Sequence, residues 1–124
     1  MIALELRDRR SEGRAYVNLG NAYDNMGDYH QAIDFHEKDL EIALNLEDRD
    51  GEKRAYNNLG NAYNSLGDYH RAIELHEQAL VIAIELGTHR SEGAAYNNLG
   101  NAYSNLGDYH RAIELYERAL AIAI

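Results

Sequence analysis

The chain has 124 residues and a formal net charge of −9, from twelve Lys and Arg against twenty-one Asp and Glu. A surface this acidic is repelled by phosphate groups, so we expect no nucleic-acid partner and no membrane partner. Without Cys the chain has no disulfide framework, thiol nucleophile or thiolate metal site. Its apolar runs are shorter than the roughly 20 residues of a membrane-spanning helix, and its start lacks the basic residues of a secretory signal. We therefore expect a cytoplasmic protein or a fragment of one.

The sequence repeats with a period of forty residues. Leu-Gly-Asn-Ala-Tyr begins at Leu19, Leu59 and Leu99, and Gly-Asp-Tyr-His begins eight residues later in each copy. Such a period is typical of a solenoid, whose units bury their apolar faces against their neighbours. The predicted organisation is one continuous domain. Residues 1–10 form the end of a preceding second helix and a connector, and the repeats span 11–50, 51–90 and an uncapped 91–124.

Each repeat is predicted to form two helices. In the middle copy Tyr56, Leu59 and Tyr63 lie three or four residues apart and mark one face of the first helix. The expected N-caps of the first helices are Ser11, Asp50 and Ser91, and their expected ends are Gly27, Gly67 and Gly107. The second helices are expected to begin after Asp28, Asp68 and Asp108 and to run to about Asn45, Glu85 and the C-terminus.

A glycine lies in the middle of each first helix, at Gly20, Gly60 and Gly100. Glycine costs about 1 kcal/mol relative to alanine at such a position. We therefore expect the second helix to approach closely at these three points, where a side chain would interfere.

These positions resemble the tetratricopeptide repeat, whose signature places an aromatic residue, Leu-Gly and Tyr on the first helix and Ala, an aromatic residue and Ala on the second. The middle copy matches at Tyr56, Leu59, Gly60, Tyr63, Ala72 and Ala79. Three residues depart from the signature. His36 and His76 replace the aromatic residue of the second helix, and Asp39 replaces the later Ala. The forty-residue length is most similar to Pins/LGN-type arrays. The resemblance implies an all-α fold, a right-handed α-solenoid of three hairpins plus an N-terminal helix stub.

Six histidines raise the question of metal binding or acid–base catalysis. His30, His70 and His110 each have a carboxylate four residues later, but such a pair offers two ligands where zinc takes three or four. Tyr116 stands where the other copies have His36 and His76, which indicates a packing role for these rings. The chain also lacks the sequence patterns of common catalytic sites. We expect no enzyme activity, no metal and no cofactor.

The first helices carry a polar stripe rich in asparagine. Its members, the candidate peptide-binding residues, are Arg14, Asn21, Asp24, Arg54, Asn57, Asn61, Asn64, Asn97 and Asn101. An amide both donates and accepts hydrogen bonds, so a ladder of amides suits the backbone of an extended segment, and the two arginines suit an acidic side chain. The resemblance places the stripe on the concave side of the superhelix. The sequence thus predicts a non-catalytic scaffold that binds a peptide or protein segment, although some asparagines alternatively bond only to neighbouring helices.

The two ends of the chain suggest a second hypothesis. The last residues stop within the repeat pattern without a polar capping helix, and only a short stretch precedes the first repeat. In a longer array these two surfaces meet, so we expect them to be complementary and to stack head to tail. The candidate association residues are Met1, Ile2, Leu4, Leu120, Ile122 and Ile124. The chain is then an assembly element, either a natural fragment or an engineered repeat module.

Overall fold

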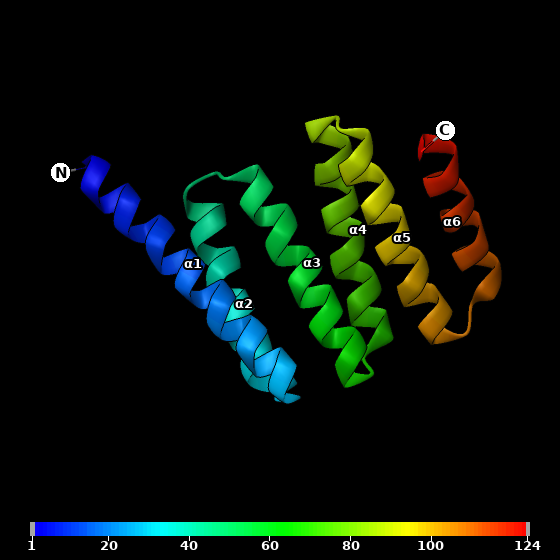
Figure 1. Ribbon diagram of the computed structural model, residues 1–124, viewed down its shortest axis with the longest axis horizontal. Helices are drawn as coiled ribbons and strands as arrows, with labels where there is room; N and C mark the ends of the chain where they lie inside the picture. Colours follow the sequence, from blue (N-terminus) through cyan, green and yellow to red (C-terminus); the bar gives the residue numbers. More distant parts are fainter. Residues whose placement is uncertain (1, 124) are drawn as a thin grey trace.

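Six helices make up the computed structural model, which describes the backbone of residues 2–123 and the side chains of residues 8–123. They are α1 (Ile2–Met26), α2 (Tyr29–Asn45), α3 (Arg49–Leu66), α4 (Tyr69–Leu86), α5 (His89–Leu106) and α6 (Tyr109–Ala123). Consecutive helices pair into three hairpins that follow one another along the long axis, with the two termini at opposite ends (Figure 1). The predicted all-α solenoid of three hairpins is confirmed.

The turn inside each hairpin has the predicted geometry. The glycines at positions 27, 67 and 107 have φ angles of +84°, +93° and +94°, in the left-handed region that other residues rarely adopt. The aspartate that follows each glycine accepts a hydrogen bond at 3.3 Å from the backbone N–H three residues later. This bond satisfies one of the free N–H groups at the start of the second helix.

The helices α3 and α5 begin earlier than predicted. The α3 cap is Asp48, whose side chain accepts from the N–H of Gly51 at 3.0 Å, and the α5 cap is Thr88, which accepts from the N–H of Ser91 at 3.3 Å. The predicted caps Asp50 and Ser91 were therefore wrong, since both lie inside a helix. The residue before each of these caps, Glu47 or Gly87, has a positive φ, which ends the preceding helix. The connector between the two helices is therefore short.

The expected connector near residue 10 is absent from the structure. α1 is one helix from Ile2 to Met26, so Ser11 is not an N-cap. The end of a preceding helix and a connector were expected at residues 1–10, but residues 2–10 are instead part of α1. Arg7 stands at the position of the left-handed Gly87, and arginine is a good helix former. Neither glycine nor proline occurs before Gly13 to interrupt the helix.

Neighbouring repeats pack through apolar side chains at matched positions. Ile33 of α2, which is 6% exposed, clusters with Leu59 and Ala62 of α3. The residues forty positions later form the same cluster between α4 and α5. Burial of these side chains is the main stabilisation between hairpins, and it aligns α1, α3 and α5 as a row of first helices.

Candidate functional site

Buried rings on the second helices hold the first helices in place. His36 and His76 are 0% and 1% exposed. A Cβ placed on Gly20 would lie 2.5 Å from His36 Cε1, and one on Gly60 would lie 2.5 Å from His76 Nε2. Tyr116 packs in the same way in the third hairpin. The predicted close approach and the packing role of these rings are confirmed, and burial lowers the pKa of His76 to about 4.

Five stripe residues are exposed and available. Within the part of the chain that the structure describes, their side chains form no hydrogen bond or ion pair with another residue. They are Arg14, Asn21, Arg54, Asn61 and Asn97, which come from α1, α3 and α5. Their assignment to peptide binding stays a prediction.

Three other stripe residues contact the ring that packs on the mid-helix glycine of their own hairpin. Asp24 Oδ2 lies 3.3 Å from His36 Nε2, Asn57 Oδ1 lies 3.1 Å from His76 Nδ1, and Asn101 Oδ1 accepts from the Tyr116 hydroxyl at 2.5 Å. Asn57 also accepts a hydrogen bond from Asn98 Nδ2 of the next first helix at 3.5 Å. Asn64 is half-buried. Asn57 and Asn101 therefore bond to other residues of the protein, which was the alternative to peptide binding.

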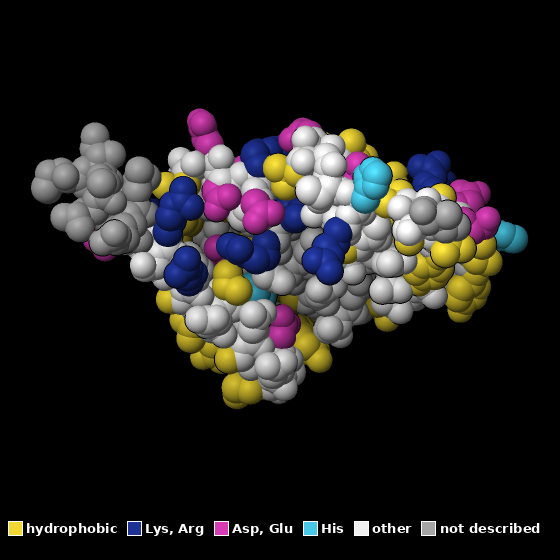
Figure 2. Space-filling view, turned by 45° about the horizontal axis from the view of Figure 1, so that its top comes forward, with side chains coloured by type: hydrophobic (Ala, Val, Ile, Leu, Met, Phe, Trp, Pro, Cys, Tyr) yellow, Lys and Arg dark blue, Asp and Glu magenta, His cyan; other side chains and the backbone are white. Residues whose placement is uncertain are grey.

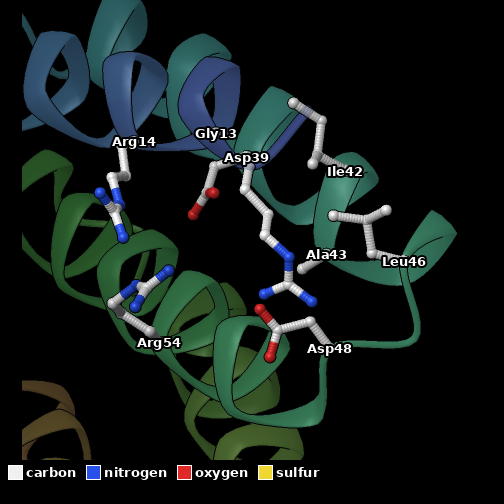
Figure 3. Close-up of a pocket in the computed structure, with 9 residues that line it drawn as sticks. Gly13, Arg14, Asp39, Ile42, Ala43, Leu46, Asp48 and Arg54 are labelled. Atoms are coloured by element: carbon white, nitrogen blue, oxygen red, sulfur yellow. The ribbon is translucent and has the colours of Figure 1, made fainter. Parts of the chain in front are cut away.

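Two cavities meet at a pair of arginines. One, of about 140 Å³, lies at the junction of α1, α2 and α3, and the other, of about 240 Å³, extends towards Val17; Arg14 and Arg54 line both. The two guanidinium groups face one another, and the carboxylate of Asp39 points towards the space between them (Figure 3). Figure 2 shows Lys and Arg side chains gathered with acidic ones on one face, towards the end where the chain begins. The stripe thus has two arginines at this end, beside the carboxylate of Asp39.

Asp39 belongs to this site, although it is not among the stripe residues predicted from the sequence. The side chain is 3% exposed, and its Oδ2 has no hydrogen-bond partner in the described part of the chain. Burial raises the pKa of the carboxyl group, while the charge of Arg54 opposes that shift. The available signal was the departure from the repeat, because Ala79 and Ala119 occupy the same position in the other copies.

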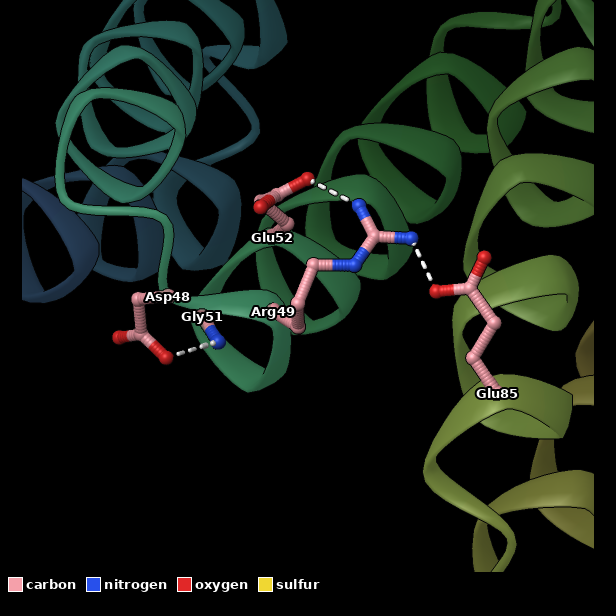
Figure 4. Close-up of polar contacts among 5 residues, drawn as sticks. All are labelled: Asp48, Arg49, Gly51, Glu52 and Glu85. Carbon is pink, nitrogen blue, oxygen red and sulfur yellow. Dashed lines mark hydrogen bonds and ion pairs between the residues drawn. The ribbon is translucent and has the colours of Figure 1, made fainter.

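A second polar cluster ties α3 to α4. Arg49 donates to Glu52 Oε1 at 2.7 Å and also contacts Glu85 of α4 (Figure 4). Glu52 is 4% exposed, so its carboxylate depends on this guanidinium for compensation of its charge. The cluster lies beside the Asp48 cap and is structural, because every charge in it has a partner.

The predicted association residues are described only in part. Leu120 is 62% exposed and Ile122 is half-buried. Met1, Ile2, Leu4 and Ile124 lie outside the residues whose side chains the structure describes. Among the described residues, no helix is long and apolar enough to cross a membrane, and no three acidic or histidine side chains are grouped as metal ligands.

Solved structures share this arrangement of hairpins. The TPR domain of Arabidopsis FLU is 26% identical with a TM-score of 0.80, over 91% of this chain and 95% of that one. BtubC (BKLC) from P. vanneervenii is 27% identical with a TM-score of 0.84, over 90% of this chain and 46% of that one. The TPR2AB domain of yeast Sti1, in a complex with pHSP90, is 24% identical with a TM-score of 0.77, over 90% of this chain and 41% of that one.

The sequence comparisons agree with the structural ones. No curated protein matches the chain at a significant level. The sequence profile of the tetratricopeptide repeat matches residues 11–85 and 54–124, which together span nearly the whole chain. The finer similarity to Pins/LGN-type arrays stays a prediction. Three hairpins, each with a ring packed on a mid-helix glycine, and a profile match over most of the sequence place this chain in the tetratricopeptide repeat family.

Proposed function

We propose that the chain is a protein-interaction scaffold that binds an extended peptide segment along α1, α3 and α5. The observation that carries the proposal is the row of exposed Arg and Asn side chains without partners in the described residues. Yeast Sti1, whose structure holds pHSP90, supports it as an example of this fold with a protein ligand.

The amides supply the expected recognition chemistry. Each of Asn21 and Asn61 can donate to a carbonyl and accept from an N–H of an extended backbone. A net gain of about 1 kcal/mol per hydrogen bond means that losing two to four such bonds weakens binding by roughly 30-fold or more. Asn101 is less suitable for a test than Asn61, because it also holds the Tyr116 hydroxyl.

The test uses peptides selected from a displayed random 15-residue library. Peptides that bind the chain are measured by fluorescence anisotropy against a double variant, Asn21→Ala with Asn61→Ala. We expect binding weaker by roughly 30-fold or more, with helicity and melting temperature not lowered. The control removes two exposed amides from second helices, Gln31→Ala with Gln78→Ala, and should bind normally. Equal loss in both variants, or no loss in the first, rejects the groove.

A second candidate function, head-to-tail association, is favoured by the exposure of matched residues. Ile113 is 53% exposed, whereas its equivalents in the first two repeats are 6% and 7% exposed. At the other end Leu19 is 42% exposed, whereas Leu59 and Leu99 are 2% and 5% exposed. The interior junctions bury these two positions against each other. Ile113 of one copy is thus proposed to pack on Leu19 of a second copy.

Sedimentation velocity of single variants tests this association. Ile113→Asp places a charge in one of the two contact faces, and Leu19→Asp places a charge in the other. We therefore expect each variant alone to be monomeric. Because the contact joins two different faces, an equal mixture should form dimers that grow no further. A wild-type chain that stays monomeric at high concentration, or a mixture without dimers, refutes the second candidate.

A further inference from the structure

The cavity at the junction of α1, α2 and α3 depends on residues particular to the first pair of repeats. Gly13 and Asp39 line it. A Cβ on Gly13 would lie 3.2 Å from Asp39 Oδ1, so the glycine makes room for the carboxylate. Forty residues later Lys53 and Ala79 occupy these positions. The second junction therefore has neither this carboxylate nor the space beside it.

Three arginines, Arg10, Arg14 and Arg54, and two aspartates, Asp39 and Asp48, line this cavity. Arg14 and Arg54 face one another across it and form no ion pair within the described residues (Figure 3). Like charges held close together repel, and the carboxylate of Asp39 offsets this repulsion only in part. A second anion between the two guanidinium groups accepts charge-assisted hydrogen bonds from both. Ala94 stands at the corresponding position of the third repeat, so the second junction cannot form such a pair.

Asp39 adds a requirement for a hydrogen-bond donor. Its side chain is 3% exposed, its Oδ2 is without a partner in the described part of the chain, and its carboxylate points into the cavity. A buried acceptor without a partner is unfavourable, and a ligand that brings a donor removes that penalty. A bare inorganic anion satisfies the arginines alone. An acidic residue within a peptide brings both a carboxylate and neighbouring backbone N–H groups.

We propose that this cavity binds an acidic residue of the extended segment. Its carboxylate accepts hydrogen bonds from Arg14 and Arg54, and a neighbouring backbone N–H donates to Asp39 Oδ2. The inference rests on the proposed function, because it takes the segment to lie along the first helices. The second junction lacks these groups, so the acidic residue occupies one defined position and fixes the register of the segment.

The test is an NMR titration of the isotope-labelled chain with acetyl-aspartate N-methylamide, which carries one carboxylate and two amide N–H groups. We expect saturable shifts at the backbone amides of Gly13 and Arg54, and at least tenfold tighter binding than the asparagine analogue. Arg54→Gln should weaken binding at least tenfold. Arg71→Gln, which removes the same charge from an exposed pair with Glu74, should leave it unchanged.

Three results would overturn the proposal. Equal binding of the asparagine analogue removes the role of the carboxylate, and equally tight binding of sulfate, which carries no hydrogen-bond donor, removes the role of the peptide N–H. Unchanged binding in Asp39→Ala, which copies the natural Ala79, removes the assigned acceptor. The small probe does not reach the asparagine row, so it should bind normally to the Asn21→Ala, Asn61→Ala variant. This result distinguishes a failure of peptide binding along the asparagine row from a failure of binding in this cavity.

Discussion

The fit between His76 and Gly60 gives the sharpest test of the fold. In Gly60→Ala the new Cβ would lie 2.5 Å from His76 Nε2, about 0.9 Å closer than the 3.4 Å at which ordinary contact begins. The ring is 1% exposed, so other atoms of the protein enclose it. Overpacking of this degree costs about 3 kcal/mol, and the better helix propensity of alanine returns about 1 kcal/mol. We expect a net loss of about 2 kcal/mol and a melting temperature lower by about 8 °C.

Urea and thermal unfolding followed by circular dichroism at 222 nm measure this loss. The matched control is Gly93→Ala in α5, where nothing lies within 4 Å of an added Cβ. That variant should gain about 0.5–1 kcal/mol from helix propensity alone. If Gly60→Ala is as stable as the parent chain, or if both variants lose equally, the close fit of ring and glycine does not stabilise the hairpin.

Two further predictions concern buried ionisable groups. The folded pKa of His76 is about 4, below the value of about 6.5 for an unfolded histidine. The unfolded chain therefore binds more protons between these values, and stability falls as the pH is lowered from 6.5 towards 4. His76→Tyr should remove about 2 kcal/mol of the loss between pH 7 and pH 5, measured by urea unfolding; an unchanged pH dependence contradicts this. Arg49→Ala leaves the buried Glu52 without its cation and should cost about 1–3 kcal/mol. In the same urea assay Arg71→Ala, on an exposed pair, should cost under about 0.5 kcal/mol; similar losses in both refute the role of burial.

Helix ends could be predicted where one residue type meets a strict local requirement. Gly67 ends α3 because a φ of +93° is a demand that few residues other than glycine meet. The starts were less predictable, because Asp48 and Asp50 are both acceptable caps by residue type. The choice between them depends on where the preceding helix ends, which is set by its packing.

Which asparagines are available could not be predicted from their positions alone. Asn57 and Asn97 are equivalent in the repeat, yet Asn57 contacts His76 while Asn97 is exposed. The difference comes from the ring in each hairpin. A histidine carries its polar atoms within the ring, whereas Tyr116 carries its hydroxyl beyond the ring and reaches Asn101 instead. Whether an asparagine is exposed or bonded thus depends on the ring that the other helix of its hairpin carries.

The ring and the glycine on which it packs always belong to the same hairpin, sixteen residues apart in all three copies. A forty-residue segment that is duplicated or deleted therefore carries both halves of its internal fit with it. His36 and Tyr116 both pack on a glycine in this way, so the hairpins of one array need not all carry the same ring. Such an array can lengthen or shorten by whole units without changing the fit inside any hairpin, and the residues at each junction can diverge independently.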